Sequence, residues 1–254
     1  MNPQNSHKEI EREKAWLLKE KYQGVANALF EADCERLALG EPLGYVIGYT
    51  PFLNTTIFLD SHPLIPRAET EFWVENAIKE INAAPSHIRA LDLCAGSGCI
   101  GVAILKAIPD SLVEFVEIDT NHHATIEKNI RENSIDIERT KILGGDLFEN
   151  VSGVYDYIFT NPPYLDPEKK DRAEESVVTH EPALALWGGT HGMMLIEKII
   201  TESPHFLKPK GVLYIEHEPE QEEAIAVLAK KYGFSSTTSE DQYGIKRSTR
   251  LELA

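Results

Sequence analysis

The sequence predicts an α/β protein built on a doubly wound, mostly parallel sheet. From residue 88 onward, short β-rich runs alternate with stretches whose apolar residues recur at helical spacing. Such alternation is typical of a parallel sheet with helices on both faces. Two β-rich runs at the carboxyl end are separated only by residues 240–244, which predicts an antiparallel hairpin that closes the sheet.

The chain ahead of this sheet predicts two smaller units. Residues 10–21 and 25–39 carry apolar residues at helical spacing, with Gly24 as a break and Gly40 as a stop, and they indicate a helix pair. Between residues 45 and 60, β-rich runs flank a turn, which indicates a hairpin. We therefore expect a short helical amino-terminal domain at residues 1–40, a β-hairpin connector at 41–63 and the α/β domain at 64–254.

Within the α/β domain, the elements follow from apolar periodicity and turn signals. A helix is expected at residues 69–83, ahead of the first strand. The long connection at residues 165–191 carries mixed charges, which indicates a loop over a functional site rather than a linker. Strands are expected at residues 88–93, 112–118, 141–143, 155–160, 212–216, 234–239 and 245–253.

The four residues Asn161-Pro162-Pro163-Tyr164 indicate a site for a planar amino group. They directly follow an apolar strand, at the edge where open α/β sheets bind ligands. The Asn161 side-chain oxygen and the Pro162 carbonyl oxygen can each accept a hydrogen from an NH2 group, while the Tyr164 ring packs against its face. Prolines carry no N–H group, so they leave these acceptors without competing donors. Taken alone, Asn-Pro-Pro is also typical of a plain turn.

A glycine-rich turn upstream indicates a nucleotide-type cofactor. Gly96, Gly98 and Gly101 stand between an apolar strand and a helix, where glycines let the backbone approach a ligand closely. Their spacing also matches the dinucleotide fingerprint. Asp92 precedes these glycines, where it suits the ammonium group of an amino-acid cofactor, and the Asn161 motif has no task in hydride transfer. Both observations favour S-adenosylmethionine over NAD.

Two further acids follow the next two strands. Asp119 stands where a carboxylate can accept both hydroxyls of a ribose, and alternatively it caps the next helix, a role that Asn121 can also fill. Asp146 is placed to reach an adenine amino group, although Gly-Gly-Asp is also typical of a turn. We expect both acids to contact the cofactor.

These motifs together resemble the HemK/PrmC family of glutamine N5-methyltransferases. The segments Leu-Ile-Pro-Arg-Ala-Glu-Thr-Glu at residues 64–71 and Glu-Pro-Ala-Leu-Ala-Leu-Trp-Gly-Gly at 181–189 narrow the resemblance to that family, and residues 41–48 resemble its inter-domain hairpin. The resemblance implies a Rossmann-like class I S-adenosylmethionine-dependent methyltransferase domain. It also implies methyl transfer to the glutamine of the Gly-Gly-Gln motif in peptide chain release factors, which would be the protein partner.

The motifs and the resemblance assign roles to individual residues. Asn161, Pro162 and Tyr164 are the expected catalytic residues, and together with Pro163 and Arg67 they are expected to bind the substrate. Arg67 is alternatively one half of a structural salt bridge, and no metal site is expected. S-adenosylmethionine is expected to contact Asp92, Cys94, Ala95, Gly96, Ser97, Gly98, Asp119, Asp146, Leu147 and Asn161.

The chain departs from the family pattern in four places. Cys94 stands where the family usually has glycine, Ala68 replaces a proline, and Leu147 takes a place often held by an aromatic residue. The amino-terminal helical domain is also shorter than is usual in the family, where that domain helps to hold the release factor. We expect the cysteine to weaken cofactor contact at most.

Composition limits the classes of partner. The formal net charge is −16, and such a surface repels a phosphate backbone, so no direct nucleic-acid partner is expected. Three cysteines form no even disulfide framework and no zinc-ligand pattern. The sequence shows no membrane-length apolar run and no signal peptide. We expect a monomer in the cytoplasm, without membrane contact.

The expected reaction is in-line transfer of the sulfonium methyl group to an amide nitrogen. Positioning and hydrogen bonds from the NH2 group to Asn161 and Pro162 stabilise the transition state, so no general base is needed. Three alternatives stay open: an adenine N6-methyltransferase acting on nucleic acid, a glutamine methyltransferase of a ribosomal protein, and a non-catalytic S-adenosylmethionine-binding protein. The acidic charge speaks against the first, and the intact Asn161 motif speaks against the last.

Overall fold

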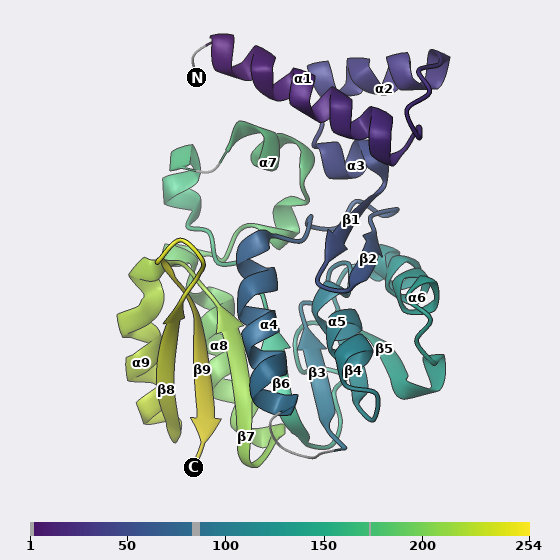
Figure 1. Ribbon diagram of the computed structural model, residues 1–254. Helices are drawn as coiled ribbons and strands as arrows, with labels where there is room; N and C mark the ends of the chain where they lie inside the picture. The colour runs from purple at the N-terminus through teal and green to yellow at the C-terminus, as the bar shows by residue number, and fades with distance from the viewer. Residues whose placement is uncertain (1–2, 83–86, 173) are drawn as a thin grey trace.

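The computed structural model describes residues 3–82, 87–172 and 174–254, and in these residues seven strands form one sheet (Figure 1). The strands are β3 (Arg89–Leu93), β4 (Leu112–Glu117), β5 (Thr140–Gly144), β6 (Tyr155–Thr160), β7 (Leu207–Glu216), β8 (Phe234–Glu240) and β9 (Lys246–Leu253). Their order is β5-β4-β3-β6-β7-β9-β8. The first five strands in this order are parallel to one another, whereas β9 is antiparallel to both β7 and β8. The predicted sheet and its carboxyl-terminal hairpin are confirmed.

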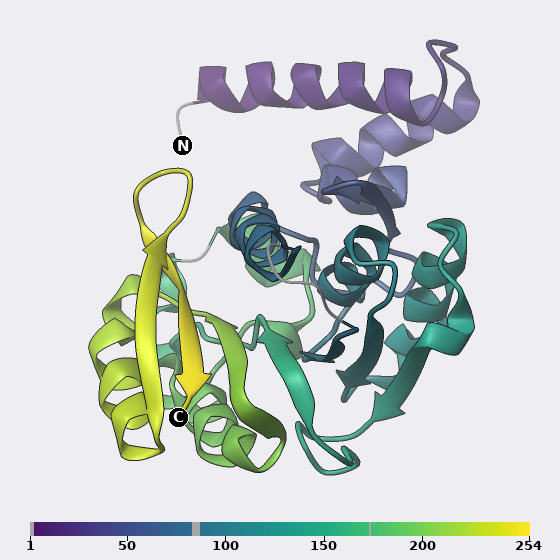
Figure 2. The ribbon, with the colours of Figure 1, turned by 60° about the horizontal axis from the view of Figure 1, so that its bottom comes forward.

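Helices cover both faces of this sheet (Figure 2). They are α4 (Ala68–Asn82), α5 (Cys99–Ala107), α6 (His123–Glu132), α8 (Met194–Glu202) and α9 (Glu222–Lys231). Ala90 of β3 packs into a core with α4, α5 and α6, while Leu91 and Leu93 pack into a second core with α8 and α9. Successive strand residues point to opposite faces, so β3 is buried on both.

The strand order reverses at β3. From this strand the chain continues to β4 and β5 on one side, and later to β6 and β7 on the other. In doubly wound sheets, such a reversal opens a crevice at the carboxyl ends of the strands, where ligands bind. The fold therefore points to one edge of the sheet as the place for a site.

Aromatic stacking fixes α4 against the sheet. Phe159 of β6 and Tyr214 of β7 stack with ring centroids 5.2 Å apart, and Trp73 of α4 stacks on them at 6.5 and 6.3 Å. Stacked aromatic pairs contribute about 0.5–1.5 kcal/mol beyond the burial of their area. The helix predicted at residues 69–83 is confirmed, and its predicted last residue, 83, lies outside the described residues.

Two helices and a third, short one form the amino-terminal unit. They are α1 (Pro3–Glu20), α2 (Ala28–Ala38) and α3 (Leu43–Ile47). The predicted helix pair is confirmed, but α2 begins later than predicted, because the Asn27 side chain accepts the N–H groups of Leu29 and Phe30 and so caps the helix there. A small apolar cluster, to which Val46 of α3 contributes, holds the three helices together.

The prediction of β structure from residue 45 is wrong for residues 45–47, which belong to α3. Tyr45 and Val46 are buried and Ile47 is partly buried by tertiary packing, which overrides their local preference. Gly48, with φ 99°, ends the helix in the left-handed conformation. The hairpin itself, β1 (Tyr49–Phe52) and β2 (Thr55–Phe58), follows directly and is confirmed.

Strand β7 starts earlier than predicted, at Leu207 instead of residue 212. The Lys-Pro-Lys-Gly stretch at residues 208–211 is typical of a turn, but Leu207 pairs with Tyr155 across a register shift, and the strand continues through it. The pairing partner on β6, which local sequence does not show, decides where the strand begins.

The segment predicted to lie over the site contains short helices rather than a plain loop. Helix α7 (Glu175–His180) lies between the sheet and the amino-terminal helices (Figure 1).

No helix of the described ranges has the length and apolar character that crossing a membrane requires. Short 3-10 turns occupy Thr120–His122, Ile137–Arg139, Pro167–Arg172, Ala183–Ala185, Thr190–Gly192, Ser203–His205 and Pro219–Gln221.

Candidate active site

The predicted site residues gather at the carboxyl ends of the parallel strands. Leu93 of β3 is paired with Thr160 of β6 on one side and with Val116 of β4 on the other. The glycine loop that follows β3 therefore lies between the Asn161 motif and the end of β4. The structure thus brings together segments that are far apart in the sequence.

The glycine loop is shaped for close approach. Gly96 and Gly98 have φ values of 55° and 77°, which favour glycine. A Cβ atom on Gly101 would lie 2.3 Å from a ring carbon of Phe115, so only glycine lets α5 pack this closely on the sheet. The side chains of Ala95 and Ser97 are buried, which leaves the backbone of this loop to face a ligand.

Asp92 supplies a buried carboxylate beside this loop. Its Oδ2 atom accepts the N–H of Gly101 at 2.8 Å, and burial raises the pKa of the carboxyl group to about 8. Its Oδ1 atom is buried and has no hydrogen-bond partner among the described residues. A buried acceptor without a partner is costly, and an ammonium group would satisfy it. The site therefore fits the amino-acid part of S-adenosylmethionine.

Sequence reasoning missed Glu117, the last residue of β4. Its side chain is 7% exposed, and it accepts the N–H of Gly96 at 2.7 Å and the N–H of Asp119 at 2.8 Å. The predicted strand ends at residue 118, so the prediction assigned the ribose to Asp119, the residue that follows. Because β4 ends at Glu117, this carboxylate lies against the glycine loop.

Asp119 takes the capping role. Its Oδ1 atom accepts the backbone N–H of Asn121 at 3.0 Å and the side-chain NH2 of Asn121 at 2.7 Å, so Asp119, and not Asn121, caps the following turn. Its predicted contact with a ribose stays a prediction.

Asp146 and Leu147 follow β5 at the same edge of the sheet. Lys198 of α8 donates to Asp146 Oδ2 at 2.6 Å. Leu147 is buried in the core under α8 and has a φ of 51°. The cofactor contacts predicted for both residues stay predictions.

The Asn161 loop presents acceptors. Asn161 donates through Nδ2 to the hydroxyl of Thr70 at 3.2 Å, and the Tyr164 hydroxyl donates to Glu216 at 3.0 Å. Pro162 and Pro163 are buried. Within the described chain, no donor engages Asn161 Oδ1 or the Pro162 carbonyl oxygen. Both oxygens are therefore available to an incoming NH2 group.

Glycines allow a second segment to lie directly under this loop. A Cβ atom on Gly188 would lie 2.5 Å from the Pro163 carbonyl oxygen, and one on Gly192 would lie 1.9 Å from that of Tyr164. Gln221 donates to the carbonyl oxygens of Tyr164 and His191, at 2.9 and 3.1 Å, and so joins the two segments. Gly188 and Gly192 thus belong to the support of the Asn161 loop.

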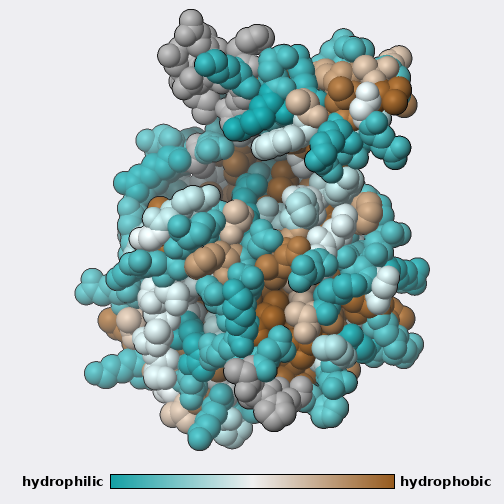
Figure 3. Space-filling model, in the orientation of Figure 1, coloured by the Kyte–Doolittle hydropathy of each residue, from teal (hydrophilic) through white to brown (hydrophobic). Residues whose placement is uncertain are grey.

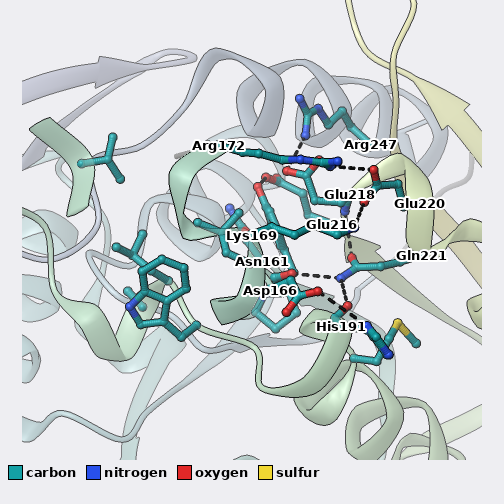
Figure 4. Close-up of a pocket in the computed structure, with 18 of the residues that line it drawn as sticks. Asn161, Asp166, Lys169, Arg172, His191, Glu216, Glu218, Glu220, Gln221 and Arg247 are labelled. Atoms are coloured by element: carbon teal, nitrogen blue, oxygen red, sulfur yellow. Dashed lines mark hydrogen bonds and ion pairs between the residues drawn. The ribbon is translucent and has the colours of Figure 1, made fainter. Parts of the chain in front are cut away.

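A cavity of about 730 Å³ opens in front of Asn161 (Figure 4). Its wall also includes Arg67, which forms an ion pair with the buried Glu181, so the salt-bridge alternative for Arg67 is confirmed. Its predicted substrate contact stays a prediction. Most other charges of the wall are paired with each other: Lys169 and Arg172 with Glu220, and Arg247 with Glu218.

Comparison with known proteins agrees with this geometry. Residues 77–245 match the family model described as Methyltransferase small domain. The chain is 32% identical over 232 residues to the release factor glutamine methyltransferase of Bifidobacterium longum, covering 87% of this chain and 79% of that protein. It is 35% identical over 214 residues to the protein of the same name from Yersinia pestis, covering 84% of this chain and 76% of that protein.

A solved structure shares the fold. A methyltransferase from Pyrococcus furiosus superposes with a TM-score of 0.53 at 17% identity, over 70% of this chain and 81% of that one. At this identity the likeness concerns the arrangement of helices and strands alone.

Proposed function

We propose that this chain, which belongs to the family of release factor glutamine methyltransferases, transfers a methyl group from S-adenosylmethionine to the side-chain amide nitrogen of a release-factor glutamine. The observation that carries the proposal is the pair of unengaged acceptors, Asn161 Oδ1 and the Pro162 carbonyl oxygen, at the mouth of a cavity. A primary amide offers two donors in one plane, and these two acceptors match them.

The cofactor would lie on the glycine loop. When bound, S-adenosylmethionine supplies an electrophilic methyl group. The partnerless Oδ1 atom of Asp92 suits its ammonium group. For the ribose hydroxyls we propose Glu117 in place of Asp119, because Glu117 contacts the glycine loop and Asp119 is engaged as a cap. Asp146 remains the acid nearest in sequence to the end of β5, and we propose it for the adenine amino group.

The protein's own residues would orient the glutamine nitrogen that receives the methyl group. An amide nitrogen is a poor nucleophile because its lone pair is delocalised. Hydrogen bonds from the NH2 group to Asn161 and Pro162 strengthen as positive charge develops on nitrogen, so they stabilise the transition state more than the ground state. The methylated nitrogen then loses a proton to water, and no general base has to act before the methyl group moves.

The partner would be a release factor that presents its glutamine to the cavity. The net charge of −16 disfavours nucleic acid as a direct partner, and the unpaired cysteines suit the cytoplasm. We propose that the chain acts there as a monomer.

Mass spectrometry after incubation of a release factor with the protein and S-adenosylmethionine tests the proposal. We expect a single added methyl group on the glutamine of Gly-Gly-Gln, mapped by peptide fragmentation, and a rate of methylation about a hundredfold lower with Asn161→Ala. If the cofactor binds but the release factor stays unmodified, the release factor is not the acceptor, and ribosomal proteins carrying exposed glutamines are the next candidates.

A further inference from the structure

A buried carboxylate, Glu216, lies beside the Asn161 loop in the wall of the cavity (Figure 4). It is the last residue of β7 and is 1% exposed. Its Oε2 atom accepts the hydroxyl of Thr70 and the ring N–H of Trp73, each at 2.7 Å, and its Oε1 atom accepts the hydroxyl of Tyr164 at 3.0 Å. Nothing in the proposed transfer uses this carboxylate directly.

We propose that Glu216 and Thr70 are positioning residues that hold the Asn161 amide with its oxygen toward the glutamine nitrogen that receives the methyl group. The inference rests on the proposed function, in which Asn161 receives a hydrogen bond from the glutamine NH2 group. It assigns the amide polarity of Asn161 to two residues that have no other role in the proposed transfer.

The hydrogen bonds from Thr70 to Glu216 and from Asn161 to Thr70 fix which way the Asn161 amide is turned. The ring N–H of Trp73 can only donate, and the hydroxyls of Thr70 and Tyr164 also donate to Glu216, so its two oxygens accept three hydrogens and the Thr70 hydrogen points to Glu216. The Thr70 oxygen then has only lone pairs left for Asn161, which must turn its NH2 group toward it. The reversed amide would place two acceptors, Asn161 Oδ1 and Thr70 Oγ1, against each other. The oxygen of Asn161 therefore faces the cavity.

The chain of hydrogen bonds from Asn161 to Thr70 to Glu216, here called the relay, is held by rigid elements. Thr70 is 2% exposed in the first turn of α4, which the stack of Trp73 on Phe159 and Tyr214 fixes to the sheet. Asn161 and Glu216 follow paired residues of β6 and β7, since Thr160 is in register with Ile215. The three groups of the relay thus come from one helix and two adjacent strands.

The consequence is selectivity for an amide over a carboxylate. The two fixed acceptors, Asn161 Oδ1 and the Pro162 carbonyl oxygen, bind an NH2 group and repel the oxygens of a glutamate side chain. Buried polar groups that are left unpaired are costly, so glutamate binds less tightly. An Asn161 side chain free to turn over would lose part of this discrimination. The relay therefore predicts a measurable ratio of affinities, and not only a rate.

The first test compares, by calorimetry, the binding of a release factor with the binding of a copy in which the glutamine is replaced by glutamate. S-adenosylhomocysteine, which has no methyl group to transfer, takes the place of the cofactor, so no reaction occurs during the titration. We expect the intact enzyme to prefer glutamine by at least about tenfold, and Thr70→Val to reduce that ratio to about threefold or less. Thr70→Ser, which keeps the hydroxyl, should restore it. Thr55→Val, a matched removal of a buried hydroxyl that bonds only the Phe52 carbonyl, should leave it unchanged.

A second test needs no substrate. Thr70→Val and Asn161→Ala are combined in a double-mutant cycle of urea unfolding. We expect the two changes to be non-additive by roughly threefold in the unfolding equilibrium constant, and Thr55→Val with Asn161→Ala to be additive. Additivity of the Thr70 pair, or an unchanged glutamine preference in Thr70→Val, overturns the relay. Coupling without methylation of any release factor would instead overturn the proposed function and leave the relay standing.

Discussion

The two halves of the candidate active site are built differently. On the cofactor side, carboxylates bind backbone N–H groups nearby in the chain or across one strand: Asp92 binds Gly101, and Glu117 binds Gly96 and Asp119. On the acceptor side, Glu216 binds side chains of Thr70, Trp73 and Tyr164, which are brought to it by folding. The cofactor half thus depends on backbone shape, and the acceptor half on the identity of distant side chains.

Because the two halves depend on different residues, loss of Asn161 should affect methyl transfer much more than cofactor binding. Asn161→Ala removes an oxygen that accepts a hydrogen from the glutamine NH2 group, and this hydrogen bond acts mainly in the transition state. We therefore expect turnover to fall by about a hundredfold, which corresponds to roughly 3 kcal/mol of transition-state stabilisation. Cofactor affinity, measured by calorimetry, should change little. A variant that turns over at nearly the normal rate would show that the acceptor pocket lies elsewhere.

Glu117 and Asp119 offer a matched pair on the cofactor side. We expect Glu117→Ala to weaken cofactor binding by about 1.5–3 kcal/mol, as for a charge-assisted hydrogen bond. Asp119→Ala should instead lower the free energy of unfolding by about 1 kcal/mol, as for the loss of a cap, with little change in cofactor affinity. Calorimetry and urea unfolding of both variants decide between them, and the opposite pattern would return the ribose to Asp119.

Asp92 should make the stability of the cofactor-free protein depend on pH. Burial raises its pKa to about 8, so between about pH 4 and pH 8 the folded state keeps a proton that the unfolded state has lost. Its contribution to stability is therefore present at low pH and falls as pH rises, by about 1.4 kcal/mol for each pH unit.

Urea unfolding across this pH window measures the effect. Asp92→Asn should reduce the slope by about 1.4 kcal/mol for each pH unit and leave the part that Glu216, whose pKa burial also raises, contributes. S-adenosylmethionine should flatten the slope, because an ammonium group beside Asp92 favours the charged carboxylate. An unchanged slope in Asp92→Asn would assign it to another group.

Cys94 tests how far backbone shape alone governs the cofactor half. It adopts φ 60°, where a side chain is strained and glycine is not. Cys94→Gly and Cys94→Ala both lose the thiol, so their difference isolates the Cβ atom. We expect the glycine variant to be more stable than the alanine variant by about 1 kcal/mol in thermal or urea unfolding. Equal stabilities would mean that the loop relaxes around the side chain.

The elements that the sequence predicted well are those whose evidence is local. The apolar runs of the five parallel strands and the Asn161 and glycine-loop motifs were found at their places, because periodicity and turn chemistry act over a few residues. The predictions were wrong where contacts with residues distant in the sequence decide the local structure. Residues 45–47 became helical through packing, and the end of β4 at Glu117, one residue earlier than expected, changed which acid faces the glycine loop.

The amino-terminal unit shows the same limit. Helices α1 and α2 were predictable from periodicity, but which of their apolar residues are covered was not. Figure 3 shows apolar residues on the surface of this unit, where Val25 and Leu29 are 64% and 71% exposed. Which part of an amphipathic helix is covered depends on partners that lie outside its own sequence.

By itself, the sequence determined the class of fold, the glycine loop and the acceptor motif, since these depend on residue types at short spacing. Only the tertiary structure decided that Thr70, Tyr164 and Glu216 form one hydrogen-bonded group beside Asn161, and that Glu117 lies against Gly96. A hydrogen bond needs its two atoms within about 3 Å, and for residues far apart in the chain only the packed sheet brings them that close.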